Sequence, residues 1–203
     1  KTTLKKWMRK KMNGLNSGLP SSADTVYFFI DEFTNYNDTA IGIKTILLLN
    51  RLGYKVLFTD HAESGRTFIS KGLLTSARKR AIRNINAFSE LINEKTPLIG
   101  LEPSAILSFR DEYPDLVRGK LKEKAIKLAK NVFILEEFLA NEMNSGKINK
   151  ELFTRDALRI KVHGHCHQKS IASVSPILQM LSFPENYIVE EIPSGCCGMA
   201  GSF

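Results

Sequence analysis

Cysteine is scarce in this sequence, which has three cysteines among 203 residues. No secretory signal peptide is recognisable, and no hydrophobic run is long enough to cross a bilayer. A small, odd number of cysteines without such a signal argues against a disulfide framework and indicates a reducing compartment. We therefore expect a cytoplasmic protein whose thiols serve another chemistry.

Acidic residues are outnumbered: 29 lysines and arginines stand against 21 aspartates and glutamates, which gives a net charge of +8. The excess is concentrated between Lys1 and Lys11, and the other basic residues are interspersed with acidic ones. Nucleic-acid binding needs a continuous basic face with aromatic side chains that stack on bases. The mixed pattern is typical of a solvated surface, so we expect no nucleic-acid partner.

Metal-binding side chains are concentrated near the C-terminal end of the sequence. Thiolate and imidazole are ligands that zinc, iron and iron–sulfur clusters prefer. We predict a metal or cluster site there and assign no catalytic residue. The candidate ligands are all three cysteines and three of the four histidines: His163, His165, Cys166, His167, Cys196 and Cys197.

The spacing of the cysteines supports this prediction. Adjacent cysteines such as Cys196 and Cys197 rarely bridge each other, because a disulfide needs particular Cα separations and dihedral angles. Gly195 and Gly198 flank the pair and permit a sharp bend that directs both thiolates to one centre. Cysteines buried as small core residues are the alternative interpretation. The prediction requires the loop of Cys166 to meet the cysteine pair in space.

Short apolar runs bounded by turn residues alternate with longer periodic stretches. The runs predict strands at 26–30, 54–58, 97–101, 160–163 and 187–192. The periodic stretches predict helices at 39–52, 73–93, 106–113, 120–132, 135–144 and 169–181. This alternation predicts an α/β fold with parallel sheets and helices on both faces.

An internal repeat divides the chain. Segments 26–65 and 160–195 both contain a strand, a polar loop, a helix, an aromatic strand and a Ser-Gly turn. We therefore predict two pseudo-repeated parallel-sheet lobes, at 25–145 and 146–203, after a basic linker or arm at 1–24. The alternative is that any two βαβ units look alike.

The expected fold places the candidate ligands where ligands commonly bind. Loops 163–167 and 194–198 both follow predicted strands, and open parallel sheets bind ligands at the carboxyl ends of their strands. The chain begins with Lys1 instead of Met and stops at Phe203, soon after the cysteine pair. We therefore expect a longer protein, with the second lobe truncated at its C-terminus.

Several strings resemble a known family. The cysteine pattern resembles the cysteine-rich CCG domain, which occurs in heterodisulfide reductase, in the iron–sulfur subunits of glycolate- and glycerol-3-phosphate-oxidising enzymes, and in lactate-utilisation proteins. The longer strings are similar to the C-terminal region of FAD-linked oxidases. These strings are Ser64-Gly-Arg66, Gly100-Leu-Glu-Pro-Ser104, Phe109-Arg-Asp-Glu-Tyr113, His163-Gly-His-Cys-His-Gln-Lys169 and Gly195-Cys-Cys-Gly198.

The resemblance implies an electron-relay module that binds an iron–sulfur cluster or metal, in an oxidoreductase acting on a 2-hydroxy acid such as D-lactate, glycolate or D-2-hydroxyglutarate. FAD would lie on another domain. The implied partners are a flavin domain and a ferredoxin-like domain in the same or a partner chain, an electron acceptor, and a membrane contacted peripherally through these partners. The sequence has no flavin motif and no Cys-x-x-Cys-x-x-Cys run, so we expect these residues alone to be inactive.

The sequence departs from the family in its first lobe. Glu63 and Ser64 stand where relatives carry a cysteine pair, and Ala105 stands where another cysteine can occur, which implies a degenerate first site. Glu32, His61 and Glu63 remain as polar residues at this site. They would either form a hard-ligand or substrate-facing pocket, or simply make ion pairs with Arg66 or Arg110. The family also has a cysteine downstream of the CCG motif, so within this sequence either a histidine supplies the fourth ligand or the site stays empty.

Two other functions remain open. Three cysteines with one histidine form a known zinc set, so the chain is alternatively a zinc-stabilised docking domain without redox chemistry. A thiol enzyme would use Cys166 as nucleophile beside His165 or His167, but neighbours on one loop seldom have the required geometry. Lys169 would cap a loop or offset thiolate charge in either case.

Overall fold

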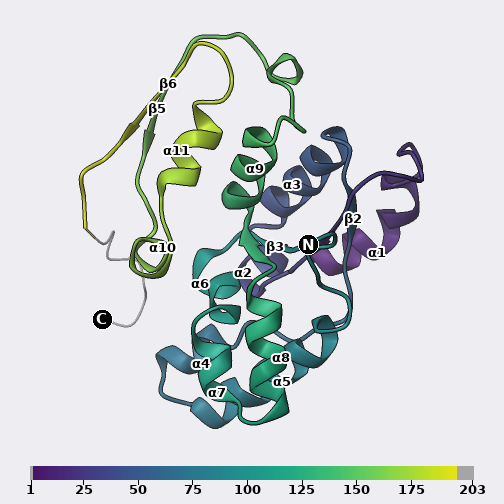
Figure 1. Cartoon of the computed structure of the whole chain (residues 1–203), viewed down its shortest axis with the longest axis vertical. Helices are drawn as coiled ribbons and strands as arrows, with labels where there is room; N and C mark the ends of the chain where they lie inside the picture. The colour runs from purple at the N-terminus through teal and green to yellow at the C-terminus, as the bar shows by residue number, and fades with distance from the viewer. Residues whose placement is uncertain (1, 196–203) are drawn as a thin grey trace. The chain divides into compact units, whose positions relative to one another are not determined.

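The computed structural model describes residues 2–195, which divide into two compact units between Phe133 and Ile134 (Figure 1). Both units are built on parallel strands flanked by helices, which confirms the predicted α/β class. The division falls earlier than the boundary predicted after residue 145. The reason is that α9 (Leu135–Asn144) packs against α11 (Ser175–Leu181) and so belongs to the second unit.

The first unit is organised around a four-stranded sheet in the order β2-β1-β3-β4. Strand β1 pairs in parallel with β2 on one side and with β3 on the other. The strands are nearly continuous apolar runs, as expected for a sheet covered on both faces. Their bounds are Thr25–Phe28 for β1, Lys55–Leu57 for β2, Leu98–Gly100 for β3 and Val132–Ile134 for β4.

Strand β4 was not predicted: the sequence analysis ended one helix at residue 132 and began the next at residue 135, with no strand between them. Helix α8 ends at Ala129, and the main-chain oxygen of Asn131 accepts a hydrogen bond from the N–H of Leu98 at 2.9 Å. The buried residues Val132 and Ile134 then continue as the strand beside β3. An apolar run of this length fits a helix or a buried strand equally well, so periodicity alone does not separate them.

Helices of the first unit form two packed groups beside the sheet (Figure 1). None of the helices within residues 2–195 is long and apolar enough to span a membrane. One group contains α1 (Leu4–Leu15), α2 (Glu32–Tyr36) and α3 (Thr39–Arg51). The other contains α4 (Arg66–Ser70), α5 (Leu74–Phe88), α7 (Glu112–Leu116) and α8 (Lys120–Ala129), reached through α6 (Pro103–Ile106) and the 3-10 turn Leu107–Phe109.

Helix α1 occupies half of the segment that we predicted as a linker. Its N-cap, Thr3, accepts a hydrogen bond from the N–H of Lys6, and Leu4 and Met8 are fully buried one turn apart. A Cβ on Gly42 of α3 would lie 2.3 Å from a methyl of Leu4, so the two helices are in close contact. The packed apolar face thus outweighs the basic, glycine-rich composition of this stretch.

The segment after α1 seals the outer edge of the sheet. The side-chain amide of Asn16 donates to the main-chain oxygen of Val56 at 3.0 Å and accepts from the Val56 N–H at 3.1 Å. One asparagine therefore pairs both outward-facing main-chain groups of the central residue of β2.

The core beneath the sheet is a cluster of aromatic rings. Phe29 contacts Phe109 edge-on, with centroids 5.1 Å apart, and Phe88 contacts both. Tyr113 packs on Phe109 at 4.5 Å, and all four residues are almost fully buried. Rings of this size bury roughly 150–250 Å² each, which makes the cluster a major source of stability.

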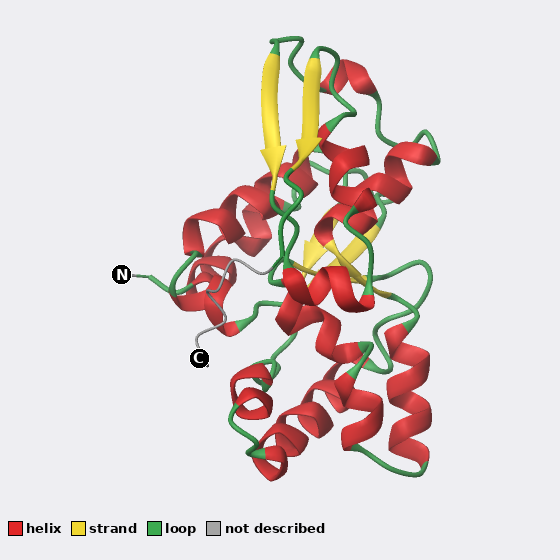
Figure 2. Cartoon of the chain, turned by 90° about the vertical axis from the view of Figure 1, so that its left-hand side faces the viewer, coloured by secondary structure: helices red, strands yellow, loops and turns green. Residues whose placement is uncertain are grey.

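The second unit contains two parallel strands and their helices. Leu158 lies opposite Tyr187 and Val162 opposite Glu191, and Figure 2 shows the two strands as adjacent parallel arrows. A single helix was predicted between them, but two short helices are present because Pro176 cannot donate to the carbonyl of Ala172. The elements after α9 are a 3-10 turn at Lys150–Leu152, β5 (Leu158–Val162), α10 (Cys166–Ile171), α11 and β6 (Tyr187–Glu191).

Candidate functional site

Strands β5 and β6 end together in the second unit. The N–H of Ile192, just past β6, donates to the main-chain oxygen of Val162 at 2.8 Å. The loop after β5 and the segment after β6 therefore leave the sheet at the same end, the carboxyl ends of the two strands. Carboxyl ends of parallel strands are where this architecture places ligands.

Three of the six predicted ligands lie together at the start of α10. His165 is the N-cap, Cys166 is the first helical residue, and His167 follows in the first turn. All three are partly buried, whereas His163 is exposed at the end of β5. Cys196 and Cys197 lie outside the described residues, so their role as ligands stays a prediction.

Lys169 joins this helix to the segment that leads toward the cysteine pair. Its ammonium donates to the main-chain oxygen of Ser194 at 2.8 Å, and the carboxylate of Glu191 lies 3.9 Å away. Ser194 is two positions before Cys196 in the sequence. The structure thus brings the chain on the way to the cysteine pair against the helix that begins with Cys166.

Gly164 makes room for this contact. A Cβ at this position would lie 2.7 Å from Cε of Lys169 and 2.5 Å from a methyl of Val174. A side chain here would therefore require Val174 or the lysine stem to shift. This local requirement explains the glycine within His163-Gly-His165.

Gln168 provides an observation on whether a cation or a hydrogen-bond donor fits here. The residue is fully buried, and its Nε2 donates to the main-chain oxygen of Ser173 at 3.0 Å. Within residues 2–195 its Oε1 has no hydrogen-bond partner. A buried acceptor without a donor is costly, so this oxygen, one residue after His167 in the sequence, fits a site that a bound cation or a donor completes.

The corresponding loop of the first unit is tied by hydrogen bonds. Glu32, which follows β1, accepts from the main-chain N–H of Ser64 at 2.9 Å and from its hydroxyl at 2.7 Å. The Glu63 carboxylate faces Arg80 at 3.7 Å. These carboxylates are therefore engaged by protein groups, and the loop at the degenerate position is held as part of the fold.

His61 is also engaged at both ring nitrogens. Its Nδ1–H donates to the main-chain oxygen of Ala62 at 2.7 Å, and its Nε2 accepts from the N–H of Ile30 at 3.3 Å. The ring stacks near Phe29 at 4.6 Å. Burial, aided by the nearby Lys5, lowers the pKa of His61 to about 4. A neutral imidazole with both nitrogens bonded has no lone pair left for a metal.

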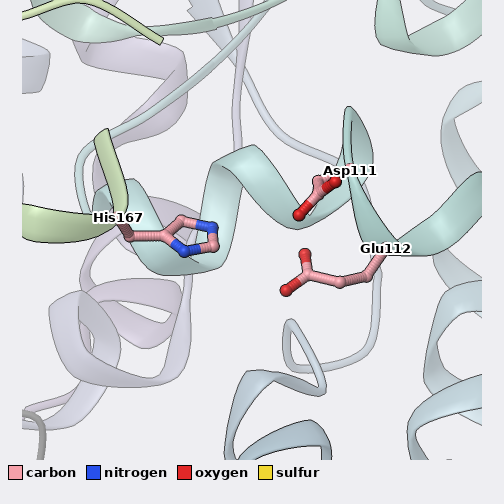
Figure 3. A group of neighbouring side chains, drawn as sticks. All are labelled: Asp111, Glu112 and His167. Atoms are coloured by element: carbon pink, nitrogen blue, oxygen red, sulfur yellow. The ribbon is translucent and has the colours of Figure 1, made fainter. Parts of the chain in front are cut away.

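The ion pairs of the first unit differ from those we expected. Arg66 pairs with Glu112 at the start of α7, and Arg110 donates through Nε to the main-chain oxygen of Val132 at 2.8 Å. Figure 3 shows Asp111 and Glu112 on neighbouring positions of this segment, Asp111 being exposed. His167, drawn in the same view, belongs to the second unit and is described with it above.

One residue that organises the first unit, Asn84, was missed by the sequence analysis. Asn84 accepts from the N–H of Ala62 and donates to the oxygen of Glu63, and it also donates to the hydroxyl of Tyr113 at 2.8 Å. Asn84 occupies a buried position of α5, in step with apolar residues. A polar residue in an apolar helical stripe was the available signal, because a buried amide needs hydrogen-bond partners.

The chain is similar in sequence to several known proteins, among them a dehydrogenase and a dehydrogenase subunit. It is 28% identical over 184 residues to a subunit of the anaerobic glycerol-3-phosphate dehydrogenase of Escherichia coli K12, covering 89% of the chain and 44% of that protein. It is 25% identical over 195 residues to the D-2-hydroxyglutarate dehydrogenase of the same organism, covering 96% of the chain and 18% of that protein. Lactate utilization protein A of Bacillus subtilis is 28% identical over 184 residues, covering 88% of the chain and 74% of that protein.

These similarities extend across most of the chain, although the chain spans less than half the length of either of the two E. coli relatives. No family model matches the sequence. No solved structure matches it either. The likeness is thus to subunits or segments of larger dehydrogenases.

Proposed function

We propose that this chain is an iron–sulfur-binding electron-relay module of a flavin-linked oxidoreductase that acts on a 2-hydroxy acid. Thiolates would hold the cluster, and one imidazole would complete the set. The proposed ligands are Cys166, Cys196 and Cys197, with His163, His165 or His167.

The proposal depends on one observation, the hydrogen bond from Lys169 to Ser194. It holds the segment that precedes the cysteine pair against α10, whose first residue is Cys166. Cys166 and the segment that leads to Cys196 and Cys197 then follow the carboxyl ends of two paired strands. A ligand set split between two strand ends is what a site in a parallel sheet requires.

A cluster in this position would pass single electrons and perform no hydride chemistry. The substrate would be oxidised at FAD on another domain, and a ferredoxin-like domain and an electron acceptor would complete the chain of transfer. The names of the relatives, which include a D-2-hydroxyglutarate dehydrogenase and a lactate utilization protein, support a 2-hydroxy acid as the substrate class. We include peripheral contact with a membrane through these partners in the proposal.

The test is metal analysis of the natural protein, purified without oxygen, with electron paramagnetic resonance before and after reduction. We expect stoichiometric iron and sulfide and a signal on reduction. Cys166→Ser, Cys196→Ser and Cys197→Ser should each lower the iron content severalfold, whereas the neighbouring control Ser170→Ala should not. Protein without iron, and without a signal on reduction, would refute the electron-relay role.

The same preparation tests the alternative of a structural zinc site. Zinc is held by the same thiolate and imidazole ligands and stabilises a closed site without redox change. Two results together would assign the chain as a docking domain. The natural protein would contain stoichiometric zinc and still transfer electrons, and each of the three cysteine variants would lose the zinc.

A further inference from the structure

Lys169 makes a hydrogen bond to the main chain in addition to a longer surface ion pair. The ammonium lies 2.8 Å from the main-chain oxygen of Ser194 but 3.9 Å from the carboxylate of Glu191, so the hydrogen bond to the main chain is the closer interaction. The lysine side chain is about one-quarter exposed, at 26%. A charged donor strengthens a hydrogen bond to a carbonyl relative to a neutral one.

This hydrogen bond lies where it can fix the path of the chain after β6. The segment after β6 is fixed at Ile192 by its hydrogen bond to Val162 and again at Ser194 by Lys169. The bonded oxygen belongs to the peptide that links Ser194 to Gly195. The direction in which the chain continues toward Cys196 is thus set by a residue of α10, the helix that starts at Cys166.

The lysine stem packs against Gly164 on its way to Ser194. The lysine stem crosses the loop where a Cβ would approach its Cε to 2.7 Å. The Lys169 side chain passes beside Gly164 and reaches from α10 to the segment after β6.

We infer that Lys169 is a positioning residue that clasps the segment leading to the Cys196–Cys197 pair onto the helix of Cys166 and so sets the geometry of the proposed cluster. The inference rests on the proposed function. Lys169 donates to the main chain and needs no contact with the cluster itself. Glu191 faces the same ammonium and helps to hold its charge near the end of β6.

The experiment compares Lys169→Met with Lys169→Arg in the natural protein, and uses the exposed β5 residue Lys161 as Lys161→Met control. Methionine keeps the length of the side chain but has no donor, whereas arginine keeps charge and donors. Hydrogen exchange at residues 191–195 is measured first, because it does not depend on a bound metal. We expect exchange roughly tenfold faster in Lys169→Met, from the loss of one charge-assisted hydrogen bond, and near wild-type in the other two variants.

The second readout is the cluster. In Lys169→Met, we expect iron to be released to a chelator several times faster and the midpoint potential and paramagnetic spectrum to change, with arginine restoring most of each. Gly164→Ala should also disturb this region, because the added methyl meets both Val174 and Cε of Lys169, so its effect is compared with that of Lys169→Met and does not replace it. Unchanged exchange at 191–195 in Lys169→Met would overturn the clasp. Faster exchange with an unchanged release rate, spectrum and potential would limit Lys169 to a structural role.

These outcomes separate the inference from the function on which it depends. Wild-type protein without iron or zinc would refute the proposed metal site, while the exchange measurement would still report on the clasp. Metal-loaded wild type with no response in Lys169→Met would refute the positioning role alone.

Discussion

The hydroxyl of Tyr113 donates to the main-chain oxygen of Ser64 at 2.7 Å, which ties α7 to a loop 49 residues earlier in the chain. The same hydroxyl accepts from the amide of Asn84. Burial raises the pKa of Tyr113, so the hydroxyl keeps its proton and remains a donor. The loop that occupies the degenerate position of the first unit is thus fixed by a neutral, fully paired network.

Replacing Tyr113 by phenylalanine should destabilise the protein by about 1–3 kcal/mol, because it leaves a buried carbonyl and one amide hydrogen without partners. The measurement is the free energy of unfolding in urea. Tyr36→Phe is the matched control: Tyr36 is 59% exposed, so its loss of a hydroxyl should change stability by less than about 0.5 kcal/mol. Equal effects of the two substitutions would contradict the network.

The depressed pKa of His61 predicts a loss of stability in mild acid. The pKa is about 4 in the folded protein against a reference of 6.5, so between these values the unfolded chain binds a proton that the folded one excludes. This contribution is complete above pH 6.5, falls as the pH is lowered, and stops changing below about 4. Its full size is of the order of 3 kcal/mol.

Urea unfolding at several pH values between 7.5 and 4 checks this decline. His61→Phe should be less stable at pH 7.5, since the N–H of Ile30 loses its acceptor, yet its stability should fall less steeply toward pH 4. A slope unaffected by His61→Phe would show that other groups cause the acid sensitivity.

Gly100 is required by close packing and not by its backbone conformation. A Cβ there would lie 2.6 Å from Cβ of Ile106, the last residue of α6. Gly100→Ala should cost about 1–3 kcal/mol by overpacking, and adding Ile106→Ala should cost less than the sum of the two single changes. Gly14→Ala is the control, because nothing lies within 4 Å and alanine favours the helix by about 0.5–1 kcal/mol. Unfolding free energies of the four variants decide the matter.

The hydrogen bonds of Glu32 predict that the first unit does not share in metal binding. Glu32→Ala removes an acceptor for two donors of Ser64 and should destabilise the protein by roughly 1.5–3 kcal/mol. The iron content of the natural protein should stay unchanged, as in the exposed control Glu190→Ala. A proportional loss of iron in Glu32→Ala alone would mean that the first unit also supplies ligands.

Much of the fold followed from local pattern. The helix predicted at 39–52 is α3, Thr39–Arg51, because a long apolar period followed by glycine is hard to mistake. The strands at 26–30, 54–58 and 97–101 were found because buried parallel strands are short apolar runs bounded by turns. Pro103 stands in the first turn of α6, as its fixed φ favours.

The remainder depended on contacts between distant residues. Helix α1 is stabilised where Leu4 packs on Gly42, and its composition gave no sign of that partner. Strand β4 became a strand because β3 offered an edge. The position of the histidines and Cys166 on one loop was visible in the sequence, but the contact of Lys169 with Ser194 was not, because it joins residues 25 apart.

The pairing of Asn16 with Val56 has a consequence for self-association. Strand edges with unpaired main-chain groups are templates for another chain, and short edges covered by side chains block fibril growth. Here a single amide acts as a cap on the exposed side of β2. Proteolytic removal of the first sixteen residues would therefore do more than delete a basic helix. It would leave the main-chain N–H and C=O of Val56 without their partner, so that β2 could pair with a strand of another molecule and start aggregation.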